Sequence, residues 1–252
     1  HYDVPQQNMV FADIDGNIGM YAPGRIPVRK PENKVQGFFP VPGWEAAYDW
    51  DGFIPFAELP HSYNPARGYV ATANHKIVPN DYPHHITFEW AAPYRARRIE
   101  DLLTGRKKHT VDSVRLLQGD VTSVMATDFL PRLLEVKPTV ALSVKSYALL
   151  ANWKGEMDRN KPEPLIFNAW IKHLGKTVYA DELGDMFKDY WDVRPVFMSN
   201  ILMGGQAHWC DDVKTAPKES CNAVILKALD AAAAELAAEM DNDDPSAWRW
   251  GD

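Results

Sequence analysis

The spacing of apolar and polar residues changes near Tyr94. Before that residue, short apolar or aromatic runs alternate with turn-forming residues, and most of the 19 prolines lie there. Such runs predict strands joined by long ordered loops, because proline and glycine interrupt regular elements. The clearest runs are residues 9–12, 53–56 and 68–73. The first part of the chain is therefore predicted to be rich in β-structure.

From residue 94 onward, apolar residues recur at helical spacing. Ile99, Leu102 and Leu103 fall on one face of a short helix that Gly105 can end. A second short helix is expected to begin at Val111. Longer helices are predicted at residues 122–136, 142–153, 164–179 and 221–240. The last is the clearest, because its apolar residues keep to one stripe and an alanine run supplies high helix propensity.

The two patterns predict an α+β protein whose character changes near residue 95. Residues 1–95 are expected to form a β-rich part with long loops containing proline and glycine, and residues 96–252 a mainly helical region. Of the 252 residues, 46% are apolar, which is enough to bury a sizeable core in one large domain or two small ones. The composition is therefore that of a globular protein.

Charge and hydropathy argue against two classes of partner. The net charge is -7 and the pI is about 5.6, without a basic stripe that could neutralise a run of phosphates, so nucleic acid is not an expected partner. The sequence has no apolar run of about 18 residues that could span a bilayer, and its first residues lack the pattern of a signal peptide. No membrane partner is expected either.

Two acidic residues near the start of the chain allow two interpretations. Asp13 and Asp15 follow an apolar run in the order Asp-x-Asp-Gly, which in an Asp-based phosphatase presents a nucleophile and a second acid beside a cation. The same residues suit a hairpin, because Asp15-Gly16 or Gly16-Asn17 can form a tight two-residue turn. The hairpin is favoured, since no later lysine and paired aspartates follow in a βα context.

Histidines and cysteines offer further candidate chemistry. His84 and His85, with His75 nearby, invite a metal site, but adjacent histidines in a strand point to opposite faces, so surface or packing roles are expected. No serine or threonine lies in a recognisable nucleophile elbow, and no glycine-rich phosphate loop is present. Cys210 and Cys221 are compatible with a disulfide that closes a short loop, although composition alone slightly favours two free thiols.

Several motifs follow one another in an order that is more specific than any one of them. Residues 10–19 read VFADIDGNIG, residues 48–56 YDWDGFIPF and residues 63–74 YNPARGYVATAN. They are followed by FEW at 88–90, YRARRI at 94–99, PLIFNAW at 164–170 and WRWGD at 248–252. Together these motifs, which extend over nearly the whole chain, resemble the middle of the β chain of penicillin acylases.

The resemblance implies an α+β fold, namely part of the αββα sandwich of N-terminal nucleophile hydrolases followed by a mainly helical region. Members of that family cleave the acyl amide bond of β-lactams, acyl-homoserine lactones and related N-acyl compounds. Their nucleophile is a serine exposed by autoproteolysis at the start of the β chain, and its own α-amino group acts as the base. The resemblance places that serine upstream of His1, so the chain alone is expected to be inactive.

Two catalytic positions are implied by the resemblance. Asn74 matches the asparagine whose amide N–H faces the oxygen of the tetrahedral intermediate in the oxyanion hole. Arg95 matches the arginine that orients this asparagine and the reacting water. From the residues alone, Asn74 could instead be an ordinary asparagine at the end of a strand, and Arg95 could form a surface salt bridge.

The resemblance also suggests substrate, metal and partner contacts. Trp50, Phe53 and Trp90 could shape the acyl pocket, although each also suits core packing. No cofactor is expected for the chemistry. A structural calcium in the intact enzyme would take the backbone of Gly37 as a ligand, but the acidic ligand expected shortly after residues 82–83 is not evident, because 84–86 read HHI. The expected partners are the α chain, the N-terminal part of the β chain and a small N-acyl substrate.

Location and disulfide bonding are linked through the same resemblance. Some secreted and periplasmic relatives carry a comparable Cys-Asp-Asp to Cys loop, so a bridge between Cys210 and Cys221 and a periplasmic or secreted protein are expected. Two alternatives stay open on the sequence. The chain could be a binding or structural domain without chemistry, or a phosphatase that uses Asp13 and Asp15.

Overall fold

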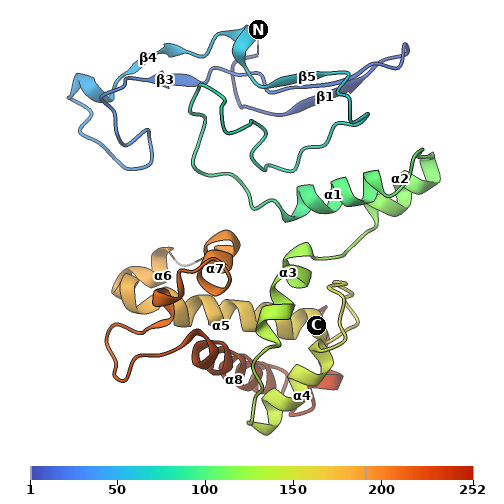
Figure 1. Cartoon of the computed structure of the whole chain (residues 1–252), viewed down its shortest axis with the longest axis vertical. Coiled ribbons are helices and arrows are strands. Elements are labelled where there is room, and N and C mark those ends of the chain that lie inside the picture. The colour runs from blue at the N-terminus through green and yellow to red at the C-terminus, as the bar shows by residue number, and fades with distance from the viewer. Residues whose placement is uncertain (1, 191, 252) are drawn as a thin grey trace. The chain divides into compact units, whose positions relative to one another are not determined.

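The structure is a computed structural model that describes residues 2–190 and 192–251, so that His1, Trp191 and Asp252 lie outside the description. The chain divides into two compact units, one that ends at Lys108 and one that begins at His109 (Figure 1). The first unit contains all the named strands and one long helix, and the second is helical. The first helix therefore belongs with the strands, whereas the sequence pattern groups it with the helical region.

The first unit contains a three-stranded antiparallel sheet. Strand β1 (Met9–Ala12) pairs with β2 (Ile18–Tyr21), which pairs with β5 (His61–Tyr63). The hairpin between β1 and β2 is confirmed, but its turn is wider than two residues. Asp13 N–H donates to the Asn17 carbonyl oxygen (3.0 Å), and Gly16 takes the positive φ (84°) that closes the loop.

A two-stranded ribbon completes the β-structure of this unit. Strand β3 (Pro27–Arg29) pairs with β4 (Trp50–Phe53). The loop that connects these two strands contains the short 3-10 helix η1 (Ala46–Tyr48). A strand is expected over residues 53–56, but β4 ends at Phe53. Pro55 has no N–H to donate, and the 3-10 helix η2 (Phe56–Glu58) follows it. The expected strand at 68–73 is wrong: this segment forms no ladder in the described chain.

The core of the first unit is small. Ile26, Ile54 and Leu59 are each at most 5% exposed and pack together. Tyr21, Val28 and Ile86 are partly buried against them. Helix α1 (Tyr94–Thr104) follows and ends at Gly105, as the sequence predicts. A core of this size leaves several aromatic side chains of the unit exposed, among them Phe38, Phe39, Trp44 and Phe88.

The second unit begins with four helices near the predicted positions. Helix α2 (Val111–Gln118) starts at a reciprocal capping box between Thr110 and Ser113, and α3 (Val124–Leu133) is capped by Ser123. They are followed by α4 (Ala141–Leu150) and α5 (Glu163–Leu183). The sequence missed the short elements after them, which are η3 (Gly184–Met186), α6 (Phe187–Tyr190), α7 (Pro195–Leu202) and η4 (Ala207–Cys210).

The core of the second unit lies between α5 and α8 (Cys221–Glu239), which run side by side (Figure 1). Trp170 of α5 is fully buried, and its indole N–H donates to the Ile225 carbonyl oxygen of α8 (2.9 Å). At their exposed flank, Glu235 accepts from Lys172 and pairs with His173, each at 2.8 Å. The chain ends after η5 (Pro245–Ala247), beyond which Trp248 is 1% exposed.

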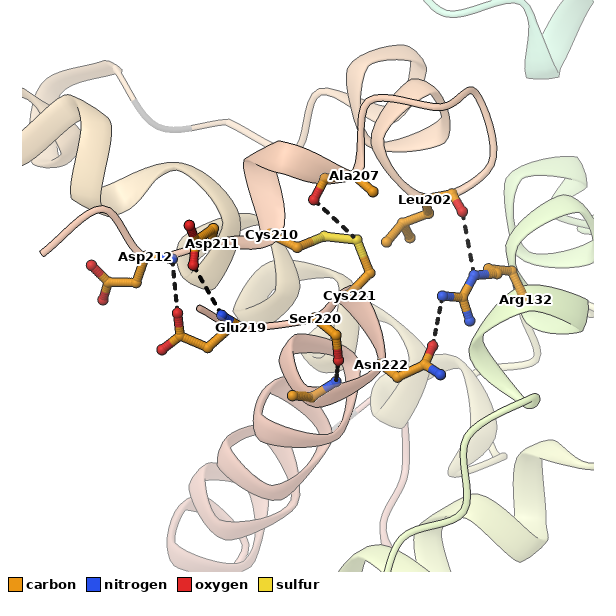
Figure 2. Close-up of a disulfide and its surroundings, with 11 residues drawn as sticks. Arg132, Leu202, Ala207, Cys210, Asp211, Asp212, Glu219, Ser220, Cys221 and Asn222 are labelled. Atoms are coloured by element: carbon orange, nitrogen blue, oxygen red, sulfur yellow. Dashed lines mark hydrogen bonds between the residues drawn. A yellow bond between two sulfur atoms is a disulfide. The ribbon is translucent and has the colours of Figure 1, made fainter. Parts of the chain in front are cut away.

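A disulfide joins Cys210 at the end of η4 to Cys221 at the start of α8 (Figure 2). The loop between them is organised by its own acids, because Asp211 Oδ1 accepts from the Glu219 N–H (2.9 Å) and Glu219 Oε2 accepts from the Asp212 N–H (3.1 Å). The two cysteines expected to pair are therefore joined in the structure, in a loop that also has its own hydrogen bonds.

Arg132 of α3 lies beside this disulfide loop (Figure 2). Its guanidinium donates to the Asn222 side-chain oxygen (2.7 Å) and the Leu202 carbonyl oxygen (3.3 Å). Because Leu202 ends α7 and Asn222 follows Cys221 in α8, one arginine connects three helices. The disulfide and Arg132 together fix the end of α8 that carries the loop.

Candidate active site

Asn74 lies in an irregular segment of the first unit and has a left-handed backbone conformation. Its φ is 61°, a value that asparagine adopts more readily than most residues because its short side chain hydrogen-bonds locally. Its carbonyl oxygen accepts from the Ala91 N–H (3.0 Å), which ties this bend to the segment that leads into α1. The side chain is exposed rather than packed among apolar neighbours. Asn74 can therefore present its carboxamide to a ligand.

Arg95, near the start of α1, fixes the orientation of that carboxamide. Its Nη2 donates to Asn74 Oδ1 (3.0 Å) and to the Ala73 carbonyl oxygen (2.9 Å). Because guanidinium is only a donor, the oxygen of the Asn74 carboxamide must face it. The Asn74 Nδ2 group is then turned away from Arg95 with its N–H bonds available to an acceptor. The sequence places these residues 21 positions apart, and the structure brings them into contact.

A cavity of about 390 Å³ opens beside this pair. One part of its lining is polar and contains amide side chains, and the other is apolar. The lining residues are Gln6, Gln7, Asn8, Ala22, Ile26, Pro27, Pro60, Asn74, Ile77, Ile86, Thr87, Glu89 and Trp90. Asn74 and Trp90, two of the residues expected at the site, therefore line one cavity. None of the lining residues is a serine or a cysteine.

Sequence patterns did not indicate the contribution of residues 6–8 to this cavity. Asn8 donates from Nδ2 to the Thr72 hydroxyl (2.5 Å), which holds the segment before β1 against the one that leads to Asn74. The two residues are 64 positions apart. A contact of this kind leaves no periodic signal, so only a three-dimensional structure or the family resemblance could have revealed it.

Trp50 and Phe53 lie elsewhere in the first unit. Their rings pack edge to face with centroids 6.0 Å apart, and the Arg25 guanidinium lies 4.3 Å from the centre of the Phe53 ring. Phe53 lines a separate cavity, and neither residue lines the one beside Asn74. The two aromatic side chains of β4 contact each other, and Phe53 also contacts Arg25. The structure therefore does not bring these two expected residues together with Asn74 and Trp90.

Gly37 adopts a positive φ (83°) in the loop after β3, but its surroundings do not suit a cation. The Arg29 Nη2 lies 2.6 Å from the point that a Cβ at this position would occupy. Among residues 2–190 and 192–251, no group of three or more His, Cys, Asp or Glu side chains could hold a metal ion. The residues present near Gly37 therefore do not fit the calcium site that the resemblance implies.

Asp13 is a structural residue of the β1–β2 turn. Its Oδ1 accepts from the N–H groups of Asp15 (3.0 Å) and Asn17 (2.8 Å), and its Oδ2 accepts from the Asn17 side chain (2.8 Å). These hydrogen bonds, first of all that from the Asn17 side chain, lower the pKa of Asp13. Both oxygens are engaged in closing the turn, which favours the hairpin interpretation over a phosphatase nucleophile.

The histidines are used in separate local contacts. His84 Nε2 pairs with Glu58 Oε2 (2.6 Å), whereas the His85 ring lies against Phe88 with centroids 4.4 Å apart. His75 Nδ1 accepts from the Ala73 N–H (3.4 Å), next to Asn74. The three side chains therefore have three different neighbours, in line with the packing roles expected for them.

Comparison with known proteins gives consistent results over the whole chain. The family model described as "Penicillin amidase" matches residues 1–252. The chain is 29% identical over 266 residues to the acyl-homoserine lactone acylase QuiP of Pseudomonas fluorescens (strain Pf0-1), a match that covers 97% of this chain and 32% of the relative. It is 36% identical over 188 residues to the penicillin G acylase of Escherichia coli, covering 69% of this chain and 22% of the relative. The chain thus spans about a third or less of the length of these relatives.

A solved structure shows the same fold. The thermostable penicillin G acylase from Alcaligenes faecalis superimposes with a TM-score of 0.72 and 20% sequence identity, covering 98% of this chain and 48% of that chain. The mixture of small sheets and helices described above agrees with this match, so the expected α+β fold is confirmed. The described residues contain no helix that is long and apolar enough to cross a membrane.

Proposed function

The chain belongs to the penicillin amidase family, and on that premise we propose that it is part of an amidohydrolase to which it supplies the side-chain donor of the oxyanion hole. Asn74 is that donor. The hydrogen bond from Arg95 to Asn74 Oδ1 is the observation that carries the proposal, because it turns the carboxamide N–H bonds away from Arg95, where they can donate to a substrate oxygen. The cavity beside the pair has room for a small substrate.

In the proposed reaction, a serine hydroxyl attacks the carbonyl carbon of an N-acyl compound, and its proton passes to the α-amino base. As the tetrahedral intermediate forms, its oxygen gains negative charge, and the Asn74 N–H donates a hydrogen bond to it. The C–N bond then breaks, the amine leaves with the proton taken from the serine, and water hydrolyses the acyl-serine ester. A donor fixed before the reaction needs no reorganisation when the charge develops, and losing one such donor typically costs about 3 to 4 kcal/mol of transition-state stabilisation. Arg95 does not touch the reacting atoms in this scheme; it positions Asn74.

The serine and its α-amino base come, in this proposal, from polypeptide outside residues 1–252, as does a second oxyanion donor. Three observations support this. None of the residues that line the cavity is a serine or cysteine, the chain spans about a third or less of its relatives, and those relatives are named as acylases. Residues 1–252 alone are then inactive.

The substrate class follows from the relatives and from the shape of the cavity. One relative is named as an acyl-homoserine lactone acylase and another as a penicillin G acylase, so an N-acyl compound is the proposed substrate. Trp90 and isoleucines of the cavity provide an apolar wall for an acyl group, and its amide side chains can bind the polar part. A periplasmic or secreted location is proposed because disulfides persist in oxidising compartments.

The experiment compares the full-length enzyme with its Asn74→Ala variant on an acyl-homoserine lactone and on penicillin G. We expect kcat to fall by about a hundredfold or more while the protein still folds. Asn80→Ala is the matched control, since Asn80 is an exposed asparagine of the same unit whose side chain accepts from Lys76 (2.7 Å) and does not line the cavity. Turnover of Asn74→Ala equal to that of Asn80→Ala would refute the assignment.

A domain without chemistry remains the alternative, and mass spectrometry of the purified native protein distinguishes the two. The amidohydrolase proposal predicts a longer chain that contains residues 1–252 and begins with serine. A species of 28.5 kDa that occurs alone as the natural product would support a binding or structural domain.

A further inference from the structure

A second cavity in the first unit is lined by Arg29 of β3. Its volume is about 140 Å³, and its lining residues are Arg29, Gln36, Gly37, Phe38, His85, Ile86, Thr87, Phe88 and Glu89. Ile86, Thr87 and Glu89 also line the cavity beside Asn74. The two cavities therefore share a wall. The resemblance implies a calcium ligand at Gly37 in the second cavity, but the residues there do not fit that ion, and the chemistry proposed for Asn74 does not use this cavity.

The backbone of Gly37 makes room for the Arg29 side chain. A Cβ at Gly37 would lie 2.6 Å from Arg29 Nη2 and 2.9 Å from Nε, closer than carbon and nitrogen atoms can approach without bonding. The positive φ of Gly37 (83°) adds a second reason for glycine at this position. Any other residue would displace the guanidinium, so the position of Arg29 depends on Gly37.

Arg29 is a cation without a partner in the part of the chain that the structure describes. It is half-buried, and neither a hydrogen bond nor an ion pair engages its guanidinium there. Arginine stays protonated in proteins, so this positive charge is permanent. A partly buried charge is costly unless an opposite charge and hydrogen bonds compensate for it, and a carboxylate fits the planar guanidinium in a two-pronged arrangement.

The neighbours of Arg29 suit an anion better than a cation. Burial, and then the charge of Arg29, lower the pKa of His85, so that its ring is neutral near pH 7 and can still donate one hydrogen bond. Phe38 and Phe88 meet edge to face with ring centroids 5.3 Å apart and form an apolar side of the cavity. Glu89 is the acid in the lining, and it has an interaction of its own.

We propose that the Arg29 cavity binds a carboxylate. The resemblance assigns a cation ligand to Gly37, and the structure places a cationic side chain against it instead. The carboxylate has two possible sources. One is the N-acyl substrate, a source that rests on the function proposed above, because this cavity adjoins the one beside Asn74. The other is an acidic side chain from the rest of the enzyme, since the relatives are about three times as long as this chain.

The experiment uses the full-length enzyme with Arg29→Met, which removes the charge and keeps an unbranched side chain. Arg29→Lys keeps the charge. If the methionine variant does not fold, Arg29→Gln takes its place, because glutamine also lacks the charge but keeps hydrogen-bond donors. Arg25→Met is the matched control, because Arg25 is an exposed arginine that contacts Phe53 and does not line this cavity. Thermal unfolding and hydrolysis are measured for all variants.

Paired substrates separate the two sources. Each N-acyl compound carries a terminal carboxylate on the acyl side or the amine side and is compared with its neutral carboxamide counterpart. If the substrate supplies the carboxylate, Arg29→Met lowers kcat/KM by about tenfold or more for the carboxylate compounds and by less than about twofold for the carboxamides. If the enzyme supplies it, Arg29→Met lowers the thermal midpoint by several degrees and affects both compounds equally, and Arg29→Lys recovers part of the loss.

The proposal is overturned if Arg29→Met shows no selective loss and no greater fall in thermal midpoint than Arg25→Met. Failure of the function proposed for Asn74 would be seen separately, as a lack of hydrolysis of any substrate by the parent enzyme. In that case calorimetric binding of hexanoate and of hexanamide to the parent and to Arg29→Met replaces the kinetic comparison. Selective binding of hexanoate that is lost in Arg29→Met, or the thermal effect above, supports the carboxylate site; absence of both contradicts it.

Discussion

Arg95 holds the oxygen of the Asn74 carboxamide at 3.0 Å, and through the same nitrogen it holds the Ala73 carbonyl oxygen at 2.9 Å. Rotation of the carboxamide by 180° would bring its NH2 group against a guanidinium, where two donors would face each other. The contact therefore selects one of two orientations of Asn74. It also ties α1, which carries Arg95, to the bend at residues 73–74, so one side chain fixes both the backbone and the amide of the proposed oxyanion donor.

Arg95→Lys should lower kcat of the full-length enzyme by about tenfold or more, because a single ammonium cannot reproduce the arrangement of the planar donor group. The two positions should also act as a unit. The double variant Arg95→Met with Asn74→Ala is expected to retain about the same kcat as Asn74→Ala alone, which steady-state kinetics measures.

Arg67→Met is a suitable control for the Arg95 variants. Arg67 forms an exposed ion pair with Glu100 (3.0 Å), and pairs of this kind contribute little to stability. Its kcat should stay near that of the parent. If the loss of kcat in the double variant equalled the combined losses of the two single variants, the positioning role of Arg95 would be contradicted.

The disulfide should contribute to stability mainly by closing its loop in the unfolded chain. Cys210 and Cys221 are 11 residues apart, and the loop-entropy relation gives roughly 3 kcal/mol for a loop of about this length. Replacing both cysteines by alanine should lower the free energy of unfolding by about that amount, as urea titration followed by circular dichroism would show. Dithiothreitol should destabilise the parent chain and leave the double variant unchanged; an equal effect on both would rule out this source of stability.

The acidic pair at the end of α5 should make stability depend on pH. Burial, followed by the hydrogen bond with Asp181, raises the pKa of Glu182 to about 7. Burial acts to raise the pKa of Asp181 as well, but hydrogen bonds from Glu182 and the Val213 N–H outweigh it, so that the pKa of Asp181 is lowered. Between the usual pKa of glutamate and about 7, the folded state keeps a proton that the unfolded state has released. The free energy of unfolding should therefore fall as the pH rises through this window.

Glu182→Gln should remove this dependence, because glutamine cannot ionise. Urea unfolding at several pH values from about 4.5 to 8 should show a variant that gains stability relative to the parent as the pH rises to about 7 and then keeps a constant difference. Glu32→Gln, at an exposed position, serves as the control. A parent and variant whose stabilities run parallel over the whole range would show that Glu182 titrates as an ordinary glutamate.

The helices were predictable from the sequence to the extent that they have one apolar stripe or a clear end signal. Gly105 ends α1, and Ser220 begins α8 with a side-chain cap, as local chemistry requires. Helix α5 extends to Leu183, beyond the predicted end, because it is apolar on most sides and its stripe gives no boundary. The short elements α6 and α7 depend on packing in the second unit and have too few turns to show a period.

The strands and the site were less predictable, because they depend on contacts between distant residues. Residues 68–73 have the composition of a strand, but no neighbouring strand pairs with them in the described chain. The pairing of Asn74 with Arg95 followed from the family resemblance, whereas the contact of Asn8 with Thr72 and the position of Arg29 against Gly37 left no pattern in the sequence. Aromatic residues such as Trp50 and Phe53 could not be assigned to a cavity by residue type alone.

The most direct test of the proposed oxyanion donor is kcat of the full-length Asn74→Asp variant. Aspartate has the size of asparagine and retains an oxygen for Arg95, so the fold and the contact with α1 should persist, but it has no N–H to donate to the intermediate. We expect kcat to fall by about a hundredfold or more, with a thermal midpoint close to that of the parent. A folded Asn74→Asp enzyme that turns over within about twofold of the parent would contradict the account.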